Sequence, residues 1–70
     1  MKLDKFSKYK FKNPIEVVVR NSLGHIFLSN VEYNVYGDGD SLDEAIENFK
    51  GELTEKYETA VKFVDNVMRE

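Results

Sequence analysis

The sequence has no cysteine, and it has only one histidine, His25, and one proline, Pro14. The absence of cysteine excludes a disulfide scaffold, a thiolate zinc site and a cysteine nucleophile. One histidine is too few for a zinc site built on a histidine pair. No apolar run reaches the roughly 18 residues of a transmembrane helix, and no signal peptide is visible. We therefore expect a cytoplasmic protein with no membrane contact, no metal and no cofactor.

The residues that are present form an ordinary globular mixture, with 41% hydrophobic and 33% charged residues in a chain of 70. A chain of this length forms one domain and buries only about 60% of the surface that its unfolded form exposes. Self-association is a common way to gain further burial. We therefore expect residues 1–70 to form a single domain that assembles into a homo-oligomer.

Charge is distributed unevenly along the chain. Residues 1–20 contain six basic and two acidic residues, whereas residues 21–70 contain four basic and eleven acidic ones. A basic arm on an acidic body can contact nucleic acid or an acidic partner, and it can equally pair with its own body or with a sister subunit. The sequence pI of about 5.1 makes nucleic acid the less favoured partner.

Two segments predict a β-hairpin. Residues 15–20 are rich in β-branched side chains and alternate in polarity, and residues 25–29 form the second strand. Residues 21–24 between them form the turn. We expect one face of the first strand to carry Ile15, Val17 and Val19.

A third strand is predicted over residues 31–36, with Val31, Tyr33 and Val35 inside and Tyr36 on the other face. Residues 37–40 then end the sheet. The basic arm, residues 1–14, is either a short edge strand or a platform of aromatic residues interleaved with lysines. The second alternative predicts nucleic-acid contacts at Lys8, Tyr9, Lys10 and Lys12.

A long amphipathic helix is predicted over residues 41–68. Ser41 and Glu44 have the spacing of a capping box, in which the hydroxyl bonds the Glu44 amide and the carboxylate returns to the Ser41 amide. The apolar positions then recur every three or four residues. Such a helix would be roughly 40 Å long, which is about twice the length of a six-residue strand. Its second half therefore needs another surface, which could be the helix folding back near Gly51, the N-terminal arm, a sister subunit or a different protein. We predict an interface with a partner or a second copy at Tyr36, Tyr57, Val61, Val64 and Met68.

Three features could carry chemistry, and each has a simpler interpretation. The acidic residues around Asp38 and Asp40 do not follow the order of a calcium loop and fit a polar turn before a capped helix. His25 could be a general base, but no serine–acid spacing accompanies it. Gly37 and Gly39 are too few for a dinucleotide fingerprint. We therefore expect no catalytic activity.

Residues 27–53 resemble the HicB-like antitoxin family. The resemblance is strongest over residues 39–48, Gly-Asp-Ser-Leu-Asp-Glu-Ala-Ile-Glu-Asn, which follow three strands as in that family. It implies a small α+β domain, related to a truncated ribonuclease-H-like sheet, that binds and masks a small toxin that cleaves messenger RNA. Many members add a C-terminal DNA-binding segment. This sequence ends at Glu70, so we expect a stand-alone member, and the predicted long helix replaces the family's usual final strand.

Taken together, the sequence predicts an α+β fold. A three-stranded antiparallel sheet, to which the N-terminal arm could add a fourth strand, is covered on one face by the C-terminal helix. The predicted function is a non-enzymatic, self-associating interaction domain whose partner is a small basic toxin-like protein. The alternative is a small nucleic-acid-binding module that uses the basic aromatic arm.

Overall fold

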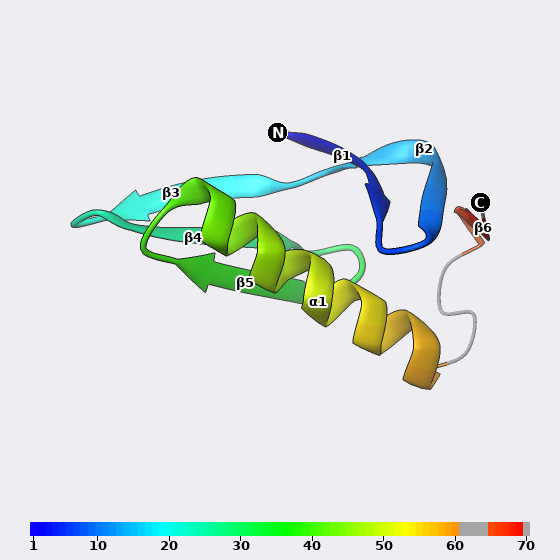
Figure 1. The fold of residues 1–70 in the computed structure, drawn as a ribbon. Helices are drawn as coiled ribbons and strands as arrows, with labels where there is room; N and C mark the ends of the chain where they lie inside the picture. The colour runs from blue at the N-terminus through cyan, green and yellow to red at the C-terminus, as the bar shows by residue number, and fades with distance from the viewer. Residues whose placement is uncertain (61–64, 70) are drawn as a thin grey trace.

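The computed structural model describes residues 1–60 and 65–69 (Figure 1). The fold is α+β, with two three-stranded antiparallel sheets and a helix that packs against strand β5. The elements in chain order are β1 (Lys2–Phe6), β2 (Tyr9–Glu16), β3 (Val18–Ser22), β4 (His25–Asn30), β5 (Val35–Gly39), α1 (Leu42–Ala60) and β6 (Val67–Arg69).

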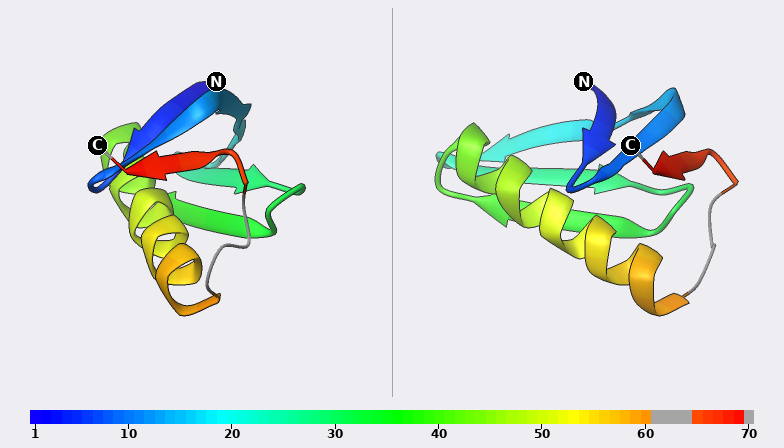
Figure 2. Two further views of the ribbon diagram at one scale, coloured as in Figure 1. Left: turned by 90° about the vertical axis from the view of Figure 1, so that its right-hand side faces the viewer. Right: turned by 45° about the vertical axis from the view of Figure 1, so that its right-hand side comes forward.

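The two sheets share one long run of extended chain, because β2 and β3 are separated only by Val17 (Figures 1 and 2). The first sheet has the order β1-β2-β6, and the second has the order β3-β4-β5. The backbone of Val17 pairs with Met1: its N–H donates to the Met1 carbonyl at 2.6 Å, and its carbonyl accepts from the Met1 ammonium at 2.9 Å. The same ammonium donates to the Glu16 carboxylate at 2.9 Å and lowers the pKa of that group. Lys2 lowers the same pKa further, by a smaller amount.

The sheets separate on the opposite edge of this run, between the first residue of β6 and the last residue of β4. Pro14 lies at this place, between Lys12, which bonds the backbone of Asn66, and Glu16, whose carbonyl accepts from the Asn30 side chain at 2.9 Å. A proline has no N–H to contribute to a ladder, so a strand position without a neighbour on that edge suits it.

Helix α1 begins at the predicted cap. The Glu44 amide donates to the Ser41 hydroxyl at 3.1 Å, and the Glu44 carboxylate accepts from the Asp40 amide at 2.6 Å rather than from the Ser41 amide. Strand β5 approaches the helix through glycines. A Cβ built on Gly37 would lie 2.6 Å from the backbone of Phe49, so only glycine permits this contact.

The core lies between the helix and both sheets and is dominated by aliphatic and aromatic side chains. The aromatic residues of the N-terminal arm belong to this core. Side chains alternate along the strand, so the lysines between the aromatic residues point outward. The buried hydrophobic residues are Leu3, Phe6, Tyr9, Phe11, Ile15, Val17, Leu28, Val35, Ala45, Phe49 and Leu53.

The predicted helix end was wrong. The helix ends at Ala60 rather than near residue 68, and residues 67–69 form β6 beside β2. A short apolar run fits a helix face and a strand equally well. The last helical turn has no basic residue to complement the dipole, and the edge of β2 provides ladder hydrogen bonds instead. The predicted interface residues Val61 and Val64 lie outside the described residues.

The boundaries of the second sheet also differ from the prediction. Residues 31–34 form a turn rather than the start of a strand, and β5 continues through Gly39. Asn34 has a positive φ of 57° and its amide bonds the Val31 carbonyl, so Val31 is 78% exposed instead of inside. β3 extends to Ser22, and the hairpin turn is confined to residues 23–24.

Two further predictions are corrected by the sheet arrangement. Val19 is 41% exposed, because α1 packs against β5 and β4 rather than against β3. The N-terminal arm does not extend the predicted sheet by a fourth strand. Its two strands form a separate sheet with β6, which sequence periodicity could not reveal because β6 is distant in the chain.

Candidate protein-interaction surface

The second sheet has one face that no described element covers. Gly37 and Gly39 point toward α1, so the alternate residues of β5 point away from it. The strand register extends this face across the sheet in two rows, Val18–Ser29–Tyr36 and Arg20–Phe27–Asp38. We call these six residues the open face.

The open face is apolar at its centre. Val18 is 50% exposed, Tyr36 is 56% exposed and Phe27 is 38% exposed. Together with Val31 and the neighbouring backbone they line a hollow of about 480 Å³. Exposed apolar residues that cluster in this way mark interaction sites more often than single exposed ones do.

His25 borders the open face and is held by two carboxylates. Its Nε2 lies 2.7 Å from Asp38 Oδ2, and its Nδ1 lies 2.8 Å from Asp40 Oδ1. The hydrogen bonds to Asp38 and then Asp40 raise the pKa of the imidazole above its ordinary value. The ring also packs edge-on against Phe27, with 4.9 Å between centroids.

The structure places Ser22 directly opposite His25 in the strand register, a pairing that the sequence did not suggest. The arrangement does not activate a nucleophile. Both ring nitrogens are engaged by carboxylates, so neither is available to take a proton from the Ser22 hydroxyl. Through these two contacts His25 ties Asp38, near the end of β5, and Asp40, which follows β5, to β4. Among the described residues no group of His, Cys, Asp and Glu side chains could hold a metal ion.

The three described residues of the predicted interface do not come together. Tyr36 lies on the open face, whereas Met68 is exposed on β6 of the other sheet. Tyr57 is partly buried against the core, where its ring meets Tyr9 at 4.8 Å and Phe6 at 6.1 Å between centroids. The sequence analysis missed Val18 and Phe27, although the alternation along residues 25–29 already separated Phe27 from Leu28.

The residues of the nucleic-acid alternative are divided between surface and core. Lys8, Lys10 and Lys12 are exposed, but Tyr9 is only 8% exposed and its hydroxyl donates to Glu58 at 2.7 Å. Lys8 lies 5.9 Å from the centroid of that ring. A buried ring offers no surface on which a base could stack, so only the charge of this arm is available to a ligand.

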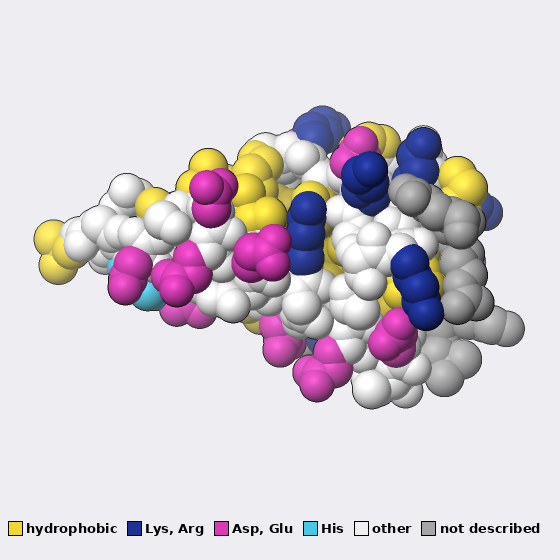
Figure 3. Space-filling view, in the orientation of Figure 1, with side chains coloured by type: hydrophobic (Ala, Val, Ile, Leu, Met, Phe, Trp, Pro, Cys, Tyr) yellow, Lys and Arg dark blue, Asp and Glu magenta, His cyan; other side chains and the backbone are white. Residues whose placement is uncertain are grey.

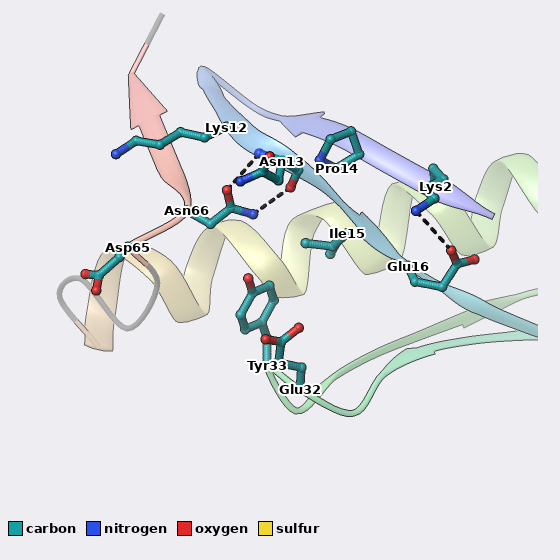
Figure 4. Close-up of a pocket in the computed structure, with 10 residues that line it drawn as sticks. All are labelled: Lys2, Lys12, Asn13, Pro14, Ile15, Glu16, Glu32, Tyr33, Asp65 and Asn66. Carbon is teal, nitrogen blue, oxygen red and sulfur yellow. Dashed lines mark hydrogen bonds and ion pairs between the residues drawn. The ribbon is translucent and has the colours of Figure 1, made fainter.

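A second hollow of about 530 Å³ lies where the two sheets separate (Figure 4). Its walls are mixed, because Pro14, Ile15 and Tyr33 stand among polar and charged residues. Two of the charged residues, Lys2 and Glu16, pair with each other at 3.5 Å. The labelled lining residues come from β1, β2, the turn after β4 and the turn before β6. The hollow is a consequence of the split between the sheets, and it offers no cluster of aligned side chains.

Neither a protein-family model, nor a curated protein, nor a solved structure matches the chain. Within the described residues, no helix combines the length and the apolar content that crossing a bilayer requires.

Proposed function

We propose that this chain is a non-enzymatic protein-interaction domain of the HicB-like antitoxin kind, which covers a small basic protein with its open face. The observation that carries this proposal is the uncovered apolar sheet face around Phe27 and Tyr36. Interface centres are enriched in aromatic residues and depleted in charge, and the middle of the open face has that composition.

Charge favours a basic partner. Residues 17–60, which form the second sheet and the helix, contain nine acidic and three basic residues. Two exposed acidic side chains, Asp38 and Asp40, lie at the β5 side of the apolar centre, where both contact His25. Complementary charge steers a basic protein toward this surface and discriminates against acidic ones.

The arrangement of elements also supports the resemblance. The expected long helix was a departure from the family, and the strand β6 after α1 removes that departure. The matching residues 39–48 have structural roles here: Gly39 packs under Glu44, Ser41 caps the helix, and Asn48 donates to the Asp38 carbonyl at 2.7 Å. The residues shared with the family thus form the junction between β5 and α1. The proposed binding activity rests on the open face instead.

Self-association is the second part of the proposal, and the edge of β3 is the place for it. All five residues of β3 are exposed, whereas the β5 edge is blocked by the Asn48 bond to the Asp38 carbonyl. Unprotected edges pair with other strands. A two-fold axis at Val19 would put Val18 beside Arg20 of a second copy and would avoid placing two arginines opposite each other.

The experiment is co-expression with the product of any neighbouring reading frame that encodes a small basic protein, followed by light scattering on a sizing column and an affinity measurement. The wild type should form a stable complex that Phe27→Ala and Tyr36→Ala each weaken by about tenfold or more, as central aromatic residues do. Leu23→Ser, at the fully exposed hairpin tip, is the matched control and should bind as the wild type does. Equal affinity of all four proteins would contradict the proposal.

A further inference from the structure

The outer face of the first sheet carries lysines in register. Lys5 of β1 lies directly opposite Lys10 of β2, and Lys10 lies opposite Met68 of β6. Lys12 follows Lys10 by two residues and therefore points to the same side. The aromatic residues between these lysines point into the core. We call Lys5, Lys10 and Lys12 the lysine face.

This arrangement costs folding free energy. Like charges directly opposite each other on neighbouring strands repel and destabilise the pair. Within residues 1–60 and 65–69, no carboxylate forms an ion pair with Lys5, Lys10 or Lys12. The lysine face is therefore a positive surface that the described part of the molecule leaves uncompensated.

Two carboxylates of this region have partners other than the three lysines. Glu16 pairs with the Met1 ammonium and with Lys2, and Glu58 accepts a hydrogen bond from the Tyr9 hydroxyl. Most of the acidic side chains are distant: the chain is 36 Å along its longest axis, and Figure 3 shows most acidic residues toward one end and the lysines toward the other, with a few acidic residues among the lysines. Because the Debye length is about 8 Å at physiological ionic strength, the acidic end does little to cancel the field at the lysine face.

We propose that the lysine face binds the phosphodiester backbone of nucleic acid. This site lies on the opposite sheet from the open face and goes beyond the proposed function. An acidic protein is the less favoured partner, because protein interfaces are depleted in lysine and rely on exposed aromatic residues. On this face Met68 is the only exposed large apolar side chain among the described residues. Phosphate contacts, in contrast, are made largely by lysine and arginine.

The chemistry of the face determines the mode of binding. Because Phe6, Tyr9 and Phe11 are buried, none of these three rings is available for base stacking. Binding is therefore electrostatic, independent of base sequence and steeply dependent on salt. Both single strands and duplexes carry the backbone that the face recognises.

The test measures fluorescence anisotropy of a labelled single-stranded oligonucleotide and of the matching duplex over a series of salt concentrations. Lys5→Gln and Lys10→Gln should each reduce the slope of log K against log salt by about 0.7 for the single strand and about 0.9 for the duplex. The probe that binds more tightly shows whether the lysine face prefers single-stranded or double-stranded nucleic acid. Arg20→Gln makes the same charge change on the other sheet and should leave both slopes unchanged.

Three results would overturn the proposal. The first is no binding of either probe at about 50 mM salt, where such contacts are strong. The second is a slope that the lysine variants and Arg20→Gln change equally, since that would reflect net charge alone. The third is displacement of the oligonucleotide by polyglutamate at equal charge, which would assign the face to an acidic protein. The open-face variants Phe27→Ala and Tyr36→Ala should bind both probes normally, so the two proposals fail independently.

Discussion

The side-chain amide of Asn66 pairs with both backbone groups of Asn13, so one side chain takes the place of a strand residue. The Asn13 N–H donates to Asn66 Oδ1 at 2.7 Å, and Asn66 Nδ2 donates to the Asn13 carbonyl at 2.6 Å. The Lys12 amide donates to the Asn66 carbonyl at 2.7 Å beside them. This residue therefore extends the β2–β6 ladder to the place where Pro14 ends it.

Replacement of Asn66 should loosen β6. Asn66→Ala removes two hydrogen bonds, each worth about 0.5–1.5 kcal/mol, and we expect a loss of about 1–2 kcal/mol in the free energy of unfolding. Asn66→Asp keeps the acceptor but loses the donor and should destabilise as well. Chemical denaturation measures the loss, and amide exchange at Lys12 and Asn13 should quicken. Unchanged exchange at these two amides would show that the pairing does not hold β6.

The two glycines next to and within α1 should respond oppositely to alanine. Gly37→Ala places a Cβ 2.6 Å from the Phe49 backbone, so the helix must shift, and overpacking of this kind costs about 1–3 kcal/mol. Gly51 has nothing within 4 Å of the new Cβ and lies inside the helix. Gly51→Ala should therefore stabilise by about 0.5–1 kcal/mol. Thermal denaturation of the pair decides whether β5 depends on this close approach.

Stability should fall with rising pH because of His25. Asp38 and Asp40 raise the folded-state pKa of the ring above the unfolded value of 6.5. The extra stability is fully present below the unfolded pKa and is lost as the pH rises through the folded pKa. Denaturation midpoints measured across that range should show the decline, and His25→Gln should remove it. An NMR titration in which the His25 pKa is at or below 6.5 would contradict this assignment.

The facing lysines predict a conflict between stability and binding. Lys5→Glu converts the pair with Lys10 into one of opposite charge and should stabilise the fold by about 0.2–1 kcal/mol. The same change should weaken binding to the oligonucleotide. Arg20→Glu, whose register partner is Phe27, makes the same charge change without this gain. A Lys5→Glu protein that is less stable than the wild type would refute the repulsion between Lys5 and Lys10.

Local signals were sufficient for part of the fold. The Ser41 cap, the start of α1, the hairpin around Gly24 and the strand at residues 25–29 were all predicted correctly, apart from shifts at their ends. Each depends on residues within about four positions of one another, because caps and tight turns are satisfied by neighbours in the chain. The open face was predicted only at Tyr36, since which face is covered depends on where the helix packs.

The sequence by itself determined the α+β character, the shared face of Ile15 and Val17, and the separation of basic and acidic halves. Only the tertiary structure decided that residues 67–69 leave the helix for the edge of β2, that Phe6, Tyr9 and Phe11 turn inward, and that Asp38 and Asp40 meet His25. The physical reason is that these contacts join residues distant in the chain. Their free energy depends on which strand edges and which apolar surfaces the rest of the fold leaves available.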